Sequence, residues 1–228
     1  KSKHLILHED TKKALRMIEK KSVSQKKFMQ YNLFANKKLL LHGISGCGKT
    51  LAAEKLAIAL NLKLLKISYF EKESIQKLKT ILEFCKKQQM VVLFEKYHLQ
   101  PNSILLTLLE KYSYNGIIVV TTTQKTIEAA LFNSFDEIIK ILLPTKTEIK
   151  ELFSMTLLTT NIEENLQSED WEYITSKLVG YSAASIIKVV EHAIKLSLVK
   201  QQNLDMECIN EAIMRRKLST LENALKIW

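Results

Sequence analysis

The chain has 228 residues, 46% of them hydrophobic and 25% charged, which is enough for one large domain or two small ones with a real core. No stretch approaches the roughly 18 consecutive apolar residues of a membrane span, and the first ten residues carry no secretory signal pattern, so a cytoplasmic protein without a membrane partner is expected. The net charge of +10 allows contact with nucleic acid, but the lysines occur as scattered pairs, which favours ordinary solvated surface.

The first 35 residues predict a lysine-rich helical collar. Helices are expected over residues 10–20 and 24–33, the first of them beginning at Asp10 and Thr11. A short, mostly apolar run, Leu39 to His42, then predicts a buried strand.

Residues 43–50 (GISGCGKT) fit the pattern G-x-x-x-x-G-K-[ST] at every fixed position. Glycines allow backbone N–H groups to wrap a phosphate, while Lys49 would reach the outer phosphates and the Thr50 hydroxyl would serve Mg²⁺. The apolar run before the loop and a helical pattern over residues 50–60 give the strand, loop and helix that such a site requires. The residues predicted to bind nucleotide here are Gly43, Ser45, Gly46, Cys47, Gly48, Lys49, Thr50 and Leu51.

The remainder of the chain predicts two kinds of domain. Up to Pro144, strands expected at 62–68, 90–95, 117–122 and 137–142 and helices expected at 74–87 and 104–112 indicate an α/β doubly wound domain with a parallel sheet, over residues 36–144. Beyond Pro144 the apolar spacing is helical throughout. Helices at 146–157, 170–178, 183–200 and 205–217 predict a small all-helical domain over residues 145–228.

The order of these motifs resembles the AAA family of ATPases, over nearly the whole chain. Six segments carry the resemblance: residues 5–11, 43–50, 91–95, 122–124, 135–144 and 180–186. It implies a P-loop NTPase core, a helical lid over the nucleotide, and ATP with Mg²⁺ as ligands. Thr50 and Glu95 are then expected to hold the metal, with Glu95 and Gln124 serving hydrolysis. Gly180 and Ala183 are expected to contact the nucleotide from the lid.

The chain also departs from the family pattern at positions that matter for hydrolysis. The second nucleotide motif of the family ends in Asp-Glu, and here Glu95 and Lys96 occupy those positions. A charged lysine cannot take a proton from water. An alternative alignment puts Glu95 in the position of the catalytic glutamate but leaves Phe94 where the metal needs oxygen. The arginines that act on a neighbouring subunit are replaced by Asn133 and Ser134.

Three functions remain open from the sequence. The first is an ATP-binding module with weak or lost hydrolysis, which uses nucleotide for assembly or conformational control. The second is an active ATPase that remodels a protein partner, although Tyr69 and Phe70 are the only candidate grip on a substrate. The third is a nucleic-acid-associated ATPase similar to clamp loaders and replication initiators. The resemblance allows oligomers, with copies of this chain or with other subunits, through AAA-type interfaces. The sequence leaves open the oligomeric state and whether the protein is an ATPase.

Overall fold

The computed structural model describes residues 6–24, 27–28, 30–31, 37–68, 75–98, 116–124, 126–160 and 166–225, together with the single positions 105, 107, 109 and 162. The predicted helices at 24–33 and 104–112 fall largely outside these residues, and Tyr69 and Phe70 lie outside them entirely. The chain divides into two compact units, Glu9–Leu142 and a second formed by Lys1–His8 with Leu143–Trp228.

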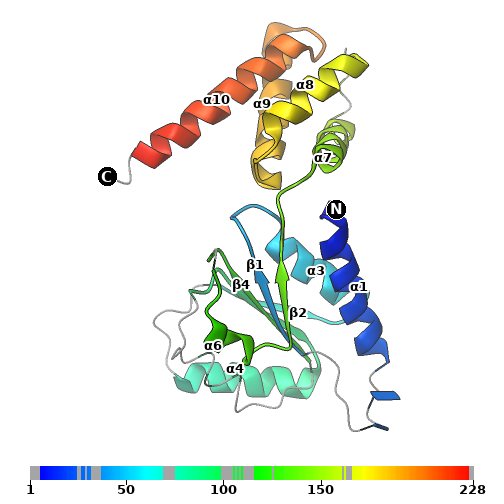
Figure 1. Ribbon diagram of the computed structural model, residues 1–228, viewed down its shortest axis with the longest axis vertical. Coiled ribbons are helices and arrows are strands. Elements are labelled where there is room, and N and C mark those ends of the chain that lie inside the picture. Colours follow the sequence, from blue (N-terminus) through cyan, green and yellow to red (C-terminus); the bar gives the residue numbers. More distant parts are fainter. Residues whose placement is uncertain are drawn as a thin grey trace. The chain divides into compact units, whose positions relative to one another are not determined.

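The first unit is built on a five-stranded parallel sheet with the strand order β2-β3-β4-β1-β5 (Figure 1). The strands are β1 (Lys38–His42), β2 (Leu64–Ser68), β3 (Val91–Glu95), β4 (Ile117–Thr122) and β5 (Glu137–Lys140). All five lie where the sequence predicted strands, and their parallel pairing confirms the expected α/β class. The residues that precede the first helix form no strand in their described part, 6–8, although Leu7 is buried.

Helices cover both faces of the sheet. Successive residues of a strand point to opposite faces, so the apolar strands need a cover on each side. These helices are α1 (Glu9–Val23), α3 (Lys49–Ala59), α4 (Ile75–Gln88) and α6 (Ala129–Phe132). Leu78 and Leu82 of α4 join Phe94 of β3 in one buried cluster. On the other face, α3 contacts β3 and β4, and α1 contacts α3 and β5. Strands β3 and β4 are therefore buried on both sides, as their apolar runs predicted.

Asp136 ties the beginning of β1 to the beginning of β5. Its Oδ2 accepts hydrogen bonds from the backbone N–H groups of Lys37 at 2.7 Å and Lys38 at 2.9 Å, and its own N–H donates to the Lys38 carbonyl. Phe135, directly before it, is buried in the core. The Phe-Asp pair thus sets the register of the edge strand beside the strand that leads into the glycine loop.

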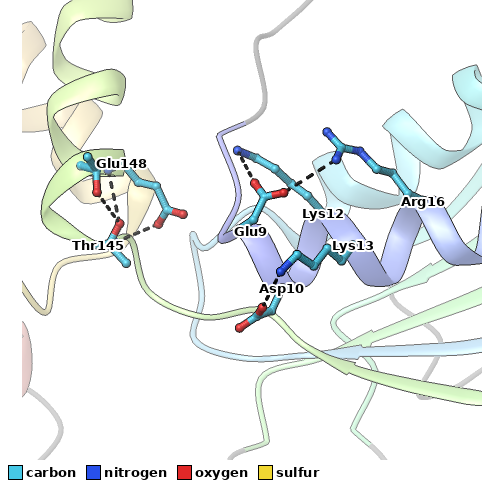
Figure 2. A network of polar contacts seen from close by, with 8 residues as sticks. Glu9, Asp10, Lys12, Lys13, Arg16, Thr145 and Glu148 are labelled. Atoms are coloured by element: carbon cyan, nitrogen blue, oxygen red, sulfur yellow. Dashed lines mark hydrogen bonds and ion pairs between the residues drawn. The ribbon is translucent and has the colours of Figure 1, made fainter.

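Helix α1 begins one residue earlier than predicted, at Glu9. Its first turn carries two carboxylates, whose negative charges interact favourably with the positive end of the helix dipole. Figure 2 shows Glu9 near Lys12 and Arg16, at 3.6 and 3.7 Å, and Asp10 near Lys13 at 3.8 Å. These pairs are exposed and add little stability.

In the residues that the structure describes, the second unit contains four helices, all at predicted places: α7 (Lys146–Leu158), α8 (Ser168–Leu178), α9 (Ala183–Lys200) and α10 (Met206–Leu225). A capping box begins α7, in which the Glu148 N–H donates to Thr145 Oγ1 and Glu148 Oε2 accepts from the Thr145 N–H at 2.9 Å (Figure 2). Phe153 of α7 and Val190 of α9 lie in one buried cluster with residues of α8 and α10, so this unit has a core of its own.

Candidate nucleotide site

The carboxyl ends of the strands meet at one edge of the sheet, as parallel strands require. Ser68 ends β2 and lies in register with Glu95, which ends β3. His42 ends β1 and lies in register with Thr122 of β4 and Lys140 of β5. Burial, with the charges of Lys140 and Lys49, lowers the pKa of His42, so its ring is neutral at pH 7.

The glycine loop connects β1 to α3 through backbone conformations that favour glycine. Gly46 and Gly48 have φ values of 83° and 99°, in the left-handed region, and Gly48 immediately precedes the first residue of α3. At Gly43, with φ of 148°, an added Cβ would lie 2.4 Å from the carbonyl oxygen of Ile141. The Cys47 side chain is buried inside the loop, and burial raises the pKa of its thiol.

Lys49 lies inside the curve of this loop. Its Nζ donates hydrogen bonds to the carbonyl oxygens of Gly43 at 2.7 Å and Ile44 at 2.9 Å, and the residue is only 7% exposed. Burial lowers the pKa of Lys49, Cys47 acts in the opposite direction, and the positive charge of Lys96 lowers the pKa further. A phosphate would relieve both unfavourable effects, because it brings negative charge to a partly desolvated ammonium.

Glu95 is held between two hydroxyl groups. Thr50 Oγ1 donates to Glu95 Oε1 at 2.6 Å, and Ser68 Oγ donates to Glu95 Oε2 at 2.8 Å. Burial raises the pKa of Glu95, but these two hydrogen bonds and the charges of Lys66 and Lys96 outweigh it and leave the pKa below its ordinary value. The carboxylate is therefore ionised at pH 7, and its oxygens with the Thr50 hydroxyl are the hard donors that Mg²⁺ prefers.

The two motifs in the sequence predicted that Thr50 and Glu95 would lie together, but the sequence analysis did not identify Ser68 as part of the site. A serine at the end of a strand has no distinctive spacing. The only signal was its place at the end of the strand that comes before the Glu95 strand in a parallel sheet.

Lys96 and Gln124 follow the ends of β3 and β4. Lys96 has φ of 53°, its N–H donates to Thr121 Oγ1 at 3.0 Å, and its side chain is exposed. The side chain of Gln124 turns toward its own strand, where Oε1 accepts from the Thr122 hydroxyl at 3.1 Å.

The positions expected to hold the trans-acting arginines differ in exposure. Ser134 is 4% exposed, whereas Asn133, the residue after α6, is exposed. An arginine introduced at Ser134 would bury its guanidinium, so Asn133 is the suitable position for one.

The predicted lid residues lie in the helical unit, which is described by itself. Gly180 has φ of 88° in the turn between α8 and α9, and an added Cβ would meet no atom within 4 Å, so its backbone conformation alone requires glycine. Ala183 is the first residue of α9, whose preceding residue Ser182 accepts from the Ser185 N–H at 3.3 Å. Contact of Gly180 and Ala183 with nucleotide stays a prediction.

A doubly wound parallel sheet with this glycine loop defines a P-loop nucleotide-binding module. Residues 39–143 match the family model of the "ATPase family associated with various cellular activities (AAA)". A curated relative, described as an uncharacterized AAA family ATPase y4kL of Sinorhizobium fredii, is 26% identical over 195 residues, and the match covers 76% of this chain. The chain spans 58% of the length of that relative.

A solved structure, the crystal structure of the FIGL-1 AAA domain, shares the fold with a TM-score of 0.77 at 16% identity. The match covers 92% of this chain and 81% of that one. Residues 39–143 are therefore similar in sequence to AAA domains, and the solved structure shows the same fold over most of the chain. Within the residues described, no helix has the length and apolar character to cross a bilayer, and no cluster of three metal-binding side chains occurs.

Proposed function

We propose that this chain is an AAA module that binds ATP with Mg²⁺, hydrolyses it slowly, and uses the bound nucleotide for assembly or conformational control. The observation that carries the proposal is the pairing of an intact phosphate loop with a second motif that ends in Glu95 and Lys96. The Thr50 hydroxyl donates a hydrogen bond to Glu95 and holds this metal-binding carboxylate in place. The next residue, Lys96, is a cation instead of a general base.

In this proposal the loop supplies most of the contacts to the phosphates. Backbone N–H groups of the loop and of the start of α3 wrap them, Lys49 turns its ammonium from the loop carbonyls to phosphate oxygen, and Thr50 with Glu95 holds the metal. The backbone residues assigned to this contact are Gly43, Ser45, Gly46, Cys47, Gly48 and Leu51. Gly180 and Ala183 contact the nucleotide from the helical unit. Hydrogen exchange at residues 180–187 tests that contact, because bound ATP should slow it.

Slow hydrolysis follows from the groups that the site lacks. A positioned general base contributes about 10² to 10⁴ in rate, and Lys96 cannot serve as one while it is charged. A trans-acting arginine is worth about 10³ to 10⁵, and Asn133 cannot supply one to a neighbouring subunit. These factors need not multiply, because residues that act as a unit are not additive. Gln124 retains an amide at the sensor position, where it would contact the terminal phosphate.

The test combines calorimetry with single-turnover hydrolysis. The purified protein should bind ATP with Mg²⁺ and retain it unhydrolysed over many minutes. Absence of any nucleotide binding would overturn the assignment of the site. Binding followed by hydrolysis at ordinary enzyme rates, about 1 s⁻¹ or faster, would leave the site intact but refute the slow-turnover part.

A second candidate is an active ATPase that remodels a protein partner and is completed by another subunit. The ionised carboxylate of Glu95 favours it, since that group could orient water if a neighbour supplied an arginine. Turnover that rises when a separate AAA chain is added would support this function over the first. AAA proteins commonly oligomerise, so the same experiment includes the oligomeric state as a second readout.

A further inference from the structure

Lys96 stands out among the lysines at the carboxyl edge of the sheet because its backbone is held on both sides. Its N–H donates to Thr121 Oγ1 at 3.0 Å, and the N–H of Tyr97 donates to the Thr121 carbonyl oxygen at 2.8 Å. The same Thr121 hydroxyl donates to the carbonyl oxygen of Phe94 at 3.3 Å. The first turn after β3 is thus fastened to β4 on either side of Lys96.

The conformation of Lys96 is itself unusual. Its φ of 53° lies in the left-handed region, which is unfavourable for a residue with a Cβ atom. The fastening by Thr121 keeps the residue in that conformation. Lys96 therefore begins its flexible four-carbon stem from a fixed point one residue beyond Glu95.

The carboxylate next to Lys96 is already engaged by other groups. Both oxygens of Glu95 accept hydrogen bonds from hydroxyl groups, those of Thr50 and Ser68. Among the described residues, no ion pair engages Lys96, whereas Lys66 pairs with Glu54 on α3. The charge of Lys96 nevertheless acts on Glu95 and on the buried Lys49, so all three groups share one small region.

Lys66 is neutralised by its pairing with Glu54, and the remaining charges, those of Lys49, Lys96 and Glu95, leave this region with an excess of positive charge. The ammonium of Lys49 donates hydrogen bonds to the loop carbonyls of Gly43 and Ile44, so it lies where it would contact the phosphates bound by the loop. Lys96 is exposed at the end of β3, on the other side of β4 from the loop strand. An anion that extends from the loop toward the end of β3 would meet both ammonium groups.

We propose that Lys96 is a phosphate ligand whose ammonium binds the terminal phosphate of ATP, so that the site selects a nucleoside triphosphate over a diphosphate and needs Mg²⁺ less. This inference rests on the proposed nucleotide site and adds the selectivity of that site. The diphosphate lacks the group that Lys96 contacts. Without Mg²⁺, Lys96 and Lys49 together supply the charge that the metal otherwise provides.

The experiment is calorimetric titration of ATP and of ADP, each with Mg²⁺ and with a chelator present, into the full chain and three variants. Lys96→Asn removes the charge and keeps a residue that tolerates positive φ. Lys96→Arg keeps the charge. Lys63→Gln is the matched control, because Lys63 is an exposed lysine just before β2, at the opposite edge of the sheet.

Lys96→Asn should weaken ATP binding about tenfold or more, the worth of one contact between charged groups, while ADP binding changes less than about twofold. The loss for ATP should be larger with the chelator. Lys96→Arg and Lys63→Gln should keep the preference of the unmodified chain for ATP.

Equal losses for ATP and ADP, or no loss for either, would overturn the role of Lys96. If Lys96→Asn unfolds, as thermal melting would reveal, Lys96→Gly takes its place, because glycine also removes the charge and adopts positive φ without strain. An unmodified chain that binds ADP as tightly as ATP refutes the inference and leaves the nucleotide site standing. An unmodified chain that binds neither nucleotide refutes both.

Discussion

Replacing Lys49 by alanine tests the phosphate loop most directly. In the free protein the change removes two hydrogen bonds, from Nζ to the carbonyl oxygens of Gly43 and Ile44. It also removes a charged group whose burial is unfavourable, as the lowered pKa of Lys49 shows. Gly43 and Ile44 are not fully buried, so water can replace the lost donor. We expect these effects to offset each other, with a net change in unfolding free energy of about 1 kcal/mol or less.

A large effect of Lys49→Ala on stability should appear only when nucleotide is added. A ligand present at 100 times its dissociation constant stabilises the native state by about 2.7 kcal/mol. For a chain of this size, each kcal/mol raises the melting temperature by roughly 2 to 4 °C, so ATP with Mg²⁺ should raise it by about 5 to 11 °C. In Lys49→Ala this increase should fall below about 1 °C.

Thermal melting with and without ATP measures both quantities in the same samples. ADP serves as a second ligand, because Lys49 reaches outer phosphates in either nucleotide. Lys55→Ala, on the same helix but beyond its first turn, is the matched control and should keep the full increase. The assignment would be refuted if ATP stabilised Lys49→Ala as much as it stabilises the unmodified chain.

Three further results follow from the same region. Gly43→Ala should destabilise the protein by about 2 kcal/mol or more, because its Cβ would overlap the Ile141 carbonyl oxygen, and a change below about 0.5 kcal/mol in urea unfolding would contradict this. The depressed pKa of Glu95 means that its ionised form adds stability above the ordinary value of 4.5 and loses that contribution as the pH falls through the folded-state pKa. Glu95→Gln should therefore lose less stability on acidification than the unmodified chain, and parallel losses would be evidence against the hydrogen-bonded carboxylate. Lys96→Glu combined with Asn133→Arg should hydrolyse ATP faster in single turnover than Lys96→Glu alone, and equal rates would show that Asn133 does not face a neighbour's nucleotide.

Much of the fold was predictable because the central strands are buried on both faces. The apolar runs at 91–94 and 117–120 have no solvent-facing residues, and the structure buries both runs completely. The predicted ends of strands and helices differ from the observed ones by a few residues at most positions, because local patterns do not define where a ladder of hydrogen bonds stops. The strand order was beyond the sequence pattern, since it depends on contacts between distant segments.

The site was predictable to the extent that it is local. The glycine loop is contiguous, and its positive φ values at Gly46 and Gly48 follow from its pattern. The approach of Thr50 to Glu95 was expected through two motifs that act together. The hydrogen bond from Ser68 and the contact of Asp136 with the start of β1 join segments far apart in the chain, and neither has a local signature.

The position of β4 has a consequence for how the protein reaches its native state. This strand lies between β1 and β3 in the sheet, yet it follows both of them in the chain. A nascent chain that ended before Ile117 would contain both nucleotide motifs without the strand that sets their spacing. The pairing of β4 with β1 closes the long segment of chain between these two strands. This closure is entropically costly, and pairings between distant strands form slowly. We therefore expect ATP to bind only after β4 has inserted, so that acquisition of nucleotide during refolding reports the insertion of this central strand.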